Sequence, residues 1–225
     1  GLVGSEMCIR DRFMTFPVIL IVGQVYNGEE FWKSKMKEGG ILALGALGAS
    51  LSAALWLVYD YVDSLPNFDE QQSVTQWLEW VSFDLLQSDY TLTSGSKILG
   101  MGVWIDSITL MILFVATFLC FLICWFSLGY MNTDPINEDR NHRFYGEFVL
   151  FALGMFGMVL ADNFLWLFIF WEVMGLCSYL LIGFYYWKDS AAYASKKAFL
   201  TTRVGDVFLM IGLFILYDIY GLSLI

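Results

Sequence analysis

The sequence is dominated by apolar runs that are long enough to cross a membrane. Residues 164–187 read FLWLFIFWEVMGLCSYLLIGFYYW, and Glu172 is the only charged residue among them. A run of about 18 apolar residues or more is typical of a spanning helix, in which every backbone polar group is hydrogen-bonded within the segment. Because 58% of all residues are hydrophobic and only 15% are charged, the chain is predicted to be an all-α polytopic membrane protein.

Six runs of this kind are predicted to cross the membrane. They span residues 13–26, 41–59, 103–130, 144–161, 164–187 and 198–220, and the first is short for a crossing. Residues 1–12, GLVGSEMCIRDR, resemble translated sequencing-adapter sequence, so they are predicted to be a non-native leader. We therefore expect two N-terminal helices in 13–62, an outer loop in 63–102, and helices three to six in 103–225.

Lysine and arginine lie almost wholly on one side of these predicted helices. The loops after the first, third and fifth runs contain Lys33, Lys35, Lys37, Arg140, Arg143, Lys188, Lys196 and Lys197. The positive-inside rule places these loops in the cytoplasm and the N-terminus outside. The acidic loop 60–102 then faces outward, and its alternating QWLEWVSF and turn-prone TSGSK predict a short β-hairpin. Nucleic acid is not an expected partner, because the sequence has no basic patch that could bind phosphates.

The cysteines do not indicate a cofactor. Cys120 and Cys124 are one helical turn apart in an apolar run, and Cys177 lies in another. The sequence has no CxxC, no cysteine–histidine set and no glycine-rich phosphate loop. Buried apolar packing is therefore the expected role of these thiols. We expect no metal, iron–sulfur cluster, flavin or haem on this chain.

Glu172 is predicted to lie near the middle of the membrane. It is about nine residues, or roughly 13 Å, from the outer end of its run. Because an unpaired charge is costly at that depth, the carboxyl group must keep a proton or face a cation or internal water. Gly175, Tyr179 and Gly183 share its helical face, which suits a close neighbour helix and offers a tyrosine hydroxyl as partner. The alternative is a permanently protonated carboxyl that has no role beyond one hydrogen bond.

The last run carries a second set of charged groups. Arg203 and Asp206 are spaced i, i+3, close enough to pair. Arg203 is expected only about 9 Å inside the cytoplasmic boundary, so it could instead extend its side chain to the interface. Lys196 and Lys197 open the run, where anchoring at the interface is the simpler interpretation, more so for Lys196. His142, in a predicted polar loop, is assigned no role.

The residues alone thus indicate protonatable groups inside a membrane protein, and two longer motifs sharpen this. VLADNFLWLFIFWEVMGLCSYLLIGFYYW and ASKKAFLTTRVGDVFLMIG resemble the large antiporter-like subunit of respiratory complex I, the proton-pumping NADH:quinone oxidoreductase. The resemblance implies that Glu172 is the essential glutamate of helix five, which partners a lysine on helix seven. It also implies that Lys197, Arg203 and Asp206 connect the internal polar axis to the cytoplasm or to a neighbouring subunit.

The same resemblance sets the expected context of the chain. That family has two inverted five-helix repeats. A chain of 225 residues would include only the first three helices of the first repeat, so an N-terminal fragment is expected. Its implied partners are other membrane-arm subunits and the lipid bilayer, with NADH and quinone handled by other subunits. A bacterial inner membrane is the expected location, with the mitochondrial inner membrane as the alternative. Three rival functions remain open: a subunit of a sodium/proton antiporter, a membrane redox subunit holding quinone or haem, and a structural scaffold.

Overall fold

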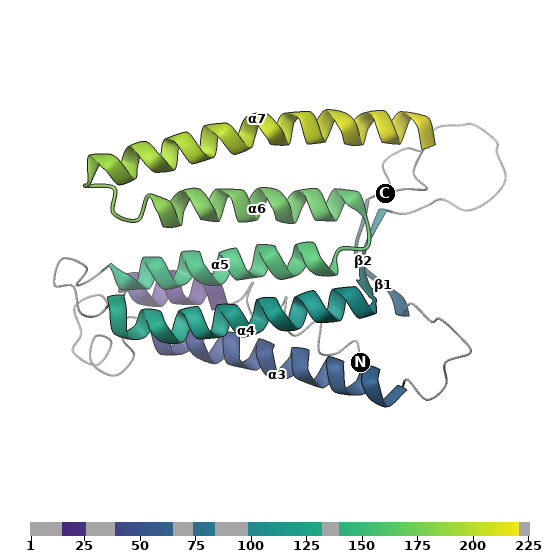
Figure 1. The fold of residues 1–225 in the computed structure, drawn as a ribbon, viewed down its shortest axis with the longest axis horizontal. Coiled ribbons are helices and arrows are strands. Elements are labelled where there is room, and N and C mark those ends of the chain that lie inside the picture. Colours follow the sequence, from purple (N-terminus) through teal and green to yellow (C-terminus); the bar gives the residue numbers. More distant parts are fainter. Residues whose placement is uncertain (1–14, 26–38, 65–73, 84–98, 132–139, 221–225) are drawn as a thin grey trace.

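The structure, a computed structural model, describes residues 15–25, 39–64, 74–83, 99–131 and 140–220. Residues 1–12, predicted to be a non-native leader, lie outside the described residues, so that prediction is not tested. The described part is a row of long helices that run side by side in alternating directions (Figure 1). They are α3 (Gly40–Ser64), α4 (Ser107–Tyr130), α5 (Asn141–Leu160), α6 (Phe164–Ile182) and α7 (Asp189–Tyr220).

These five helices are long and apolar enough to span a membrane. The prediction of an integral membrane protein with several spanning helices is therefore confirmed. A further apolar helix, Thr15–Val25, covers the first predicted run but is shorter than the about 20 residues that a crossing needs. The described residues thus hold five candidate spans where six crossings were predicted.

Two caps set where helices begin. Asp106 has extended backbone angles, and its side chain accepts a hydrogen bond of 2.7 Å from the Ser107 backbone N–H, so α4 begins at Ser107 and not at Val103 as predicted. Asn163 accepts a bond of 2.8 Å from the Trp166 N–H and opens α6. A side-chain oxygen at this position satisfies a backbone donor that the helix itself leaves free.

The last two helices differ from their predicted bounds. α6 ends at Ile182, because Gly183 caps it and the chain then turns through residues 183–187. α7 begins at Asp189, nine residues before the predicted start at 198. A carboxylate in the first turn suits the positive end of a helix, and the alanines that follow favour the helical state.

Two strands lie across one end of the bundle. β1 (Val74–Phe83) and β2 (Leu99–Ile105) pair antiparallel, with Val74 opposite Ile105 and Trp77 opposite Gly102. The residues that join the strands, 84–98, lie outside the described part of the chain. A bridge between Val103 and Ala161 attaches β2 to the turn between α5 and α6.

The hydrophobic core lies among α3, α4 and α5. Leu47, Leu113, Val149 and Phe156 are completely or almost completely buried there. α6 packs on the other side of α5 at close range: a Cβ atom at Gly154 would lie 3.2 Å from the Met174 backbone nitrogen. Since Phe170 and Met174 face α5, residue 172 faces away from it, toward α7.

Charged side chains separate toward the two ends of the bundle. One end, here called the basic end, carries Arg140, Arg143 and Lys188, where α5 and α7 begin and α6 ends. The opposite end carries Asp60, Asp106 and Asp162. Arg140 is held over the rings of Tyr186 and Trp187, at 5.6 and 5.2 Å. This separation is expected if the apolar middle of each helix lies within a membrane, because charged residues then collect at the helix ends.

Candidate functional site

Glu172 forms an ion pair with Arg203 of α7. The same guanidinium group lies 3.5 Å from the Glu172 backbone carbonyl oxygen, to which its Nη2 donates. Of the two ways to place an acid in the membrane that the sequence allowed, the structure adopts pairing with a cation. The cation comes from the next helix in the chain.

Arg203 is shared between two carboxyl groups. Its Nη1 also lies 3.5 Å from Asp206 Oδ2, which confirms the i, i+3 pairing predicted from spacing. Asp206 in turn accepts a hydrogen bond of 2.9 Å from the indole Nε1 of Trp171. These four residues, Trp171, Glu172, Arg203 and Asp206, are called the midplane cluster below.

The cluster lies deep in the membrane-spanning part of the chain. Glu172 is the ninth residue of the 19 in α6, so it is near the middle of that helix, and Arg203 must be at the same level to contact it. Because α7 begins at Asp189, Arg203 is 14 residues, or about 21 Å of helix rise, from the helix start. Extension of Arg203 to the interface, the alternative left open by the sequence, is therefore wrong.

The face predicted to surround Glu172 is the contact surface between α6 and α7. A Cβ atom at Gly175 would lie 3.9 Å from Arg203 Nη2, and one at Gly183 would lie 3.3 Å from the hydroxyl oxygen of Ser195. Between them, the rings of Tyr179 and Phe199 lie 5.1 Å apart. The hydroxyl group of Tyr179 is not a partner of Glu172 among the described residues; Arg203 takes that place.

The cluster is shielded from its surroundings only in part. The side chains of Glu172 and Arg203 are 28% and 27% exposed, and that of Asp206 is 11% exposed. If both acids are ionised, two negative charges face one positive charge. One bound proton would make the group neutral, and removing a net charge from a low-dielectric region is favourable. In this arrangement a proton and the Arg203 guanidinium group can therefore compete for the same carboxyl groups.

Lys197, the fourth predicted site residue, is not brought into the cluster. It is exposed on α7, and its backbone carbonyl oxygen accepts a bond of 2.8 Å from the hydroxyl group of Thr201. Lys197 and Arg203 are six positions apart, which places them on different faces of α7. His142, predicted in a loop, instead lies in α5 and is half-buried against Gly23.

Sequence reasoning missed Trp171. It is one of several tryptophans in the apolar runs, and its indole N–H is a donor that seeks an acceptor when it leaves water. Its position beside Glu172 is the only signal that the sequence offers. The acceptor, Asp206, lies 35 positions away in the sequence.

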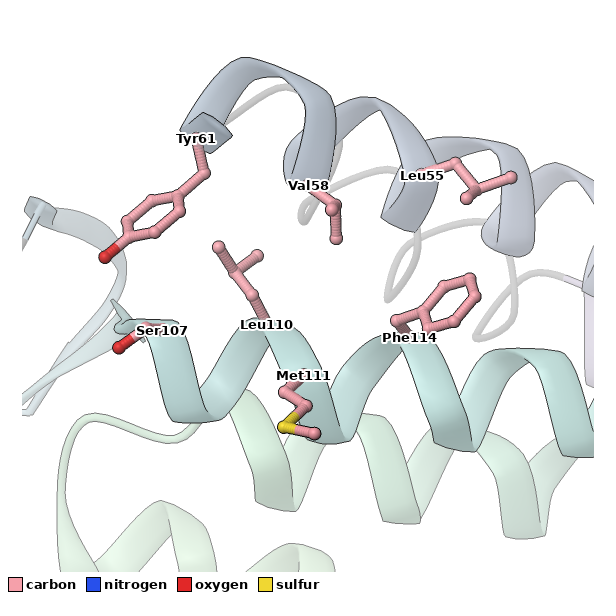
Figure 2. A pocket seen from close by; sticks show the side chains of 7 residues that line it. All are labelled: Leu55, Val58, Tyr61, Ser107, Leu110, Met111 and Phe114. Carbon is pink, nitrogen blue, oxygen red and sulfur yellow. The ribbon is translucent and has the colours of Figure 1, made fainter. Parts of the chain in front are cut away.

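One groove between two helices does not provide a site. Figure 2 shows a groove between α3 and α4, lined by Leu55, Val58, Tyr61, Ser107, Leu110, Met111 and Phe114. Its lining is almost entirely apolar and contains no carboxyl, amine or imidazole group. In the part of the chain that the structure describes, no three His, Cys, Asp or Glu residues gather in a way that could hold a metal ion.

Two protein families match the chain. Residues 161–225 match the family described as "NADH:quinone oxidoreductase/Mrp antiporter, TM", and residues 92–145 match "NADH-Ubiquinone oxidoreductase (complex I), chain 5 N-terminus". These matches, each over part of the chain, show similarity to the antiporter-like membrane subunits of complex I. Within this class the similarity is to the subunit named L or chain 5, so the resemblance inferred from the motifs is confirmed.

Curated relatives carry these names. The chain is 37% identical to NAD(P)H-quinone oxidoreductase chain 5 of Synechocystis sp. over 177 residues, which cover 79% of this chain and 23% of that protein. It is 36% identical to NADH-quinone oxidoreductase subunit L of Pseudomonas aeruginosa over 181 residues, or 80% of this chain and 27% of that protein. The chain thus spans about a quarter of the length of these relatives.

The fold also has a counterpart among solved structures. A chain of the membrane-bound sulfane sulfur reductase, an archaeal respiratory membrane complex, matches with a TM-score of 0.68 over 98% of this chain and 38% of that chain. At 17% sequence identity, this similarity concerns the fold.

Proposed function

We propose that this chain is part of a proton-translocating membrane-arm subunit of an NADH:quinone oxidoreductase. The observation that carries the proposal is the sharing of Arg203 between Glu172 and Asp206 at mid-membrane depth. The names of the relatives, subunit L and chain 5 of quinone oxidoreductases, support the same assignment.

The geometry suggests how the cluster takes part in proton transfer. When Glu172 is ionised, it holds Arg203 by charge. When a proton binds to the Glu172 carboxylate, that attraction weakens, and the guanidinium group remains paired with Asp206. Loss of the proton restores the Glu172–Arg203 pair. Trp171 keeps Asp206 oriented through both states by donating to its other oxygen. Protonation at one acid is thereby converted into a movement of a positive charge between two helices.

The remaining assignments belong to the same proposal. The basic end of the bundle faces the cytoplasm of a bacterium, and the N-terminus faces outside. The helix Thr15–Val25 is part of a sixth crossing, and β1 and β2 form the two arms of a hairpin on the outer surface. Electron transfer, NADH and quinone belong to other subunits of the complex, since the sequence lacks the ligand patterns that redox cofactors need.

A sodium/proton antiporter subunit is the second candidate. It is favoured by one observation, that the family matching residues 161–225 is described for both quinone oxidoreductases and Mrp antiporters. Both candidates need a carboxyl group that exchanges a cation inside the membrane. They differ in whether transport requires electron transfer from NADH to quinone.

Substitution of Glu172 by Gln in the assembled complex, reconstituted in phospholipid vesicles, tests the proposal. The amide keeps the shape of the side chain but cannot bind and release a proton. We expect proton uptake driven by NADH oxidation to fall by at least about tenfold. Unchanged proton transport in Glu172→Gln would contradict the proposal and favour a structural scaffold, and transport that persists without NADH and quinone would favour the antiporter. Asp218→Asn, at an exposed position near the end of α7, is the matched control and should transport normally.

A further inference from the structure

A second acid is buried in the membrane-spanning helices, apart from the midplane cluster. Glu147 of α5 is 4% exposed. Its Oε1 lies 2.7 Å from Arg143 Nε, one helical turn earlier on the same helix. Its Oε2 is buried and has no hydrogen-bond partner among the described residues. Half of this carboxyl group is therefore satisfied and half is not.

Among the residues that the structure describes, the helices around Glu147 supply no other cation. The helix Thr15–Val25 and the helices α3, α4 and α6 pack on α5, and none of them contains a lysine or an arginine. Among the titratable groups of these helices is the buried thiol of Cys177 on α6, which interacts electrostatically with Glu147. Arg143 is thus the one described counterion of Glu147, and its own side chain is 51% exposed to the surroundings.

An ordinary structural ion pair explains this arrangement poorly. The stabilising order of an i, i+4 pair places the acid before the base, and here the arginine comes first. Glu147 also lies beyond the first turn of α5, where a carboxylate no longer caps the helix. A buried carboxylate with an unsatisfied oxygen is unfavourable unless the group can take up a proton or contact water.

The position of Glu147 places it between the aqueous phase and the midplane cluster. It is six residues from the start of α5 at the basic end, or about 9 Å of helix rise. Glu172 is ten residues from the same end of α6, or about 15 Å. α5 and α6 pack closely along their length, and both helices end or begin at the basic end.

We propose that Glu147 is a second proton-binding group, which exchanges protons with water at the basic end of the bundle. In one state the carboxylate is ionised and holds Arg143. In the other, a proton from water has bound to Oε2, the ion pair has opened, and the half-exposed Arg143 turns toward the aqueous phase. Release of the proton reverses both changes. This inference rests on the proposed function, because a proton that reaches Glu172 from the basic end needs such an intermediate acceptor.

Two measurements on Glu147→Gln in the assembled complex test this inference. The first is the infrared difference spectrum between acid and alkaline pH, in which the substitution should remove the carbonyl band of one carboxylic acid. The second is NADH-driven proton transport in vesicles, which should fall by about tenfold or more. Asp218→Asn, again the control, should leave transport unchanged.

Arg143→Gln distinguishes proton exchange from a merely structural role. Without its counterion Glu147 should stay protonated, so its carboxylic acid band should persist at a pH where the unsubstituted complex has lost it. An unchanged spectrum in Glu147→Gln overturns the inference. Normal transport in Glu147→Gln also overturns it, while a loss of transport in Glu172→Gln in the same assay leaves the proposed function standing. Normal transport in both variants overturns the proposed function and this inference together.

Discussion

The two halves of the bundle differ in how deeply their helices are buried and in how their ion pairs are built. In the half made by α3, α4 and α5, here called the packed half, between 28% and 61% of the most apolar stretch of each helix is buried within this chain. In α6 and α7, the open half, the share is 6%. Hydroxyl groups in both halves donate back to their own helix, as Thr117 does to the Leu113 carbonyl and Ser178 to the Met174 carbonyl, each at 2.9 Å. In the open half, charged groups bind across helices. The ion pair of the packed half, Arg143 with Glu147, lies within one helix, whereas the pair of Glu172 with Arg203 joins two helices.

This contrast predicts that the packed half carries the stability of the fold. Phe156→Ala, at a completely buried position of α5, should lower the free energy of unfolding by about 3–5 kcal/mol, because it leaves a cavity in the core. Thermal loss of helical circular dichroism in detergent would measure the change. Phe214→Ala, on α7 where the side chain is 63% exposed, is the control and should have a far smaller effect. Equal losses of unfolding free energy in the two variants would contradict the prediction that the packed half carries the stability of the fold.

The second prediction concerns the cation of the open half. Arg203→Ala leaves Glu172 and Asp206 facing each other without a counterion. We expect proton transport to fall by about 100-fold, since breaking a charge pair in the interior costs about 3 kcal/mol. Arg203→Lys keeps the charge but loses the planar fork, so an intermediate loss of about tenfold is expected. If Arg203→Ala transports normally, the midplane cluster is not part of the path.

A third prediction tests the hydrogen bond that orients Asp206. Trp171→Phe keeps the aromatic bulk but removes the indole donor, and a lost bond to a charged acceptor of about 1.5 kcal/mol corresponds to about tenfold lower transport. Trp166 supplies a matched control, because its indole nitrogen is buried without a hydrogen-bond partner among the described residues. Trp166→Phe should therefore transport normally. Equal behaviour of the two variants would show that only ring volume matters.

The smallest effect is expected at Lys197. Because its side chain is exposed and separated from the cluster, Lys197→Gln should change transport less than about twofold. The resemblance to complex I subunits implies a larger role for this position. A loss comparable to that of Arg203→Lys in the same vesicles would restore Lys197 to the path and place its partner outside the described residues.

Local chemistry explains the fold well where a single residue decides the outcome, although the start of α4 was predicted four residues early, at 103. The carboxylate of Asp106 and the amide of Asn163 cap α4 and α6, as residues of these types at a helix start should. The shared face of Gly175, Tyr179 and Gly183 was found because helical periodicity fixes which residues lie together. In each case the relevant partner is within a few positions along the chain.

The predictions failed where the outcome depends on another helix. The start of α7 was placed too late because a polar segment rich in alanine was interpreted as a loop, and Arg203 was consequently placed too close to the interface. Periodicity indicates the depth of Glu172 along its own helix but does not reveal which group faces it from α7. The burial of Glu147 likewise depends on the other helices that pack on α5, which its own position in the sequence does not reveal.

The contacts between α6 and α7 repeat at every fourth residue on both helices, from Gly175 with Arg203 to Gly183 with Ser195. Because the contacts recur at this interval, a shift of α7 along α6 that restores equivalent contacts covers one whole helical turn, about 5.4 Å. One such step would bring Arg203 opposite Tyr179 and away from Glu172. We therefore expect the midplane cluster to have two states, one with Glu172 and Arg203 paired and one with them apart, and no stable intermediate.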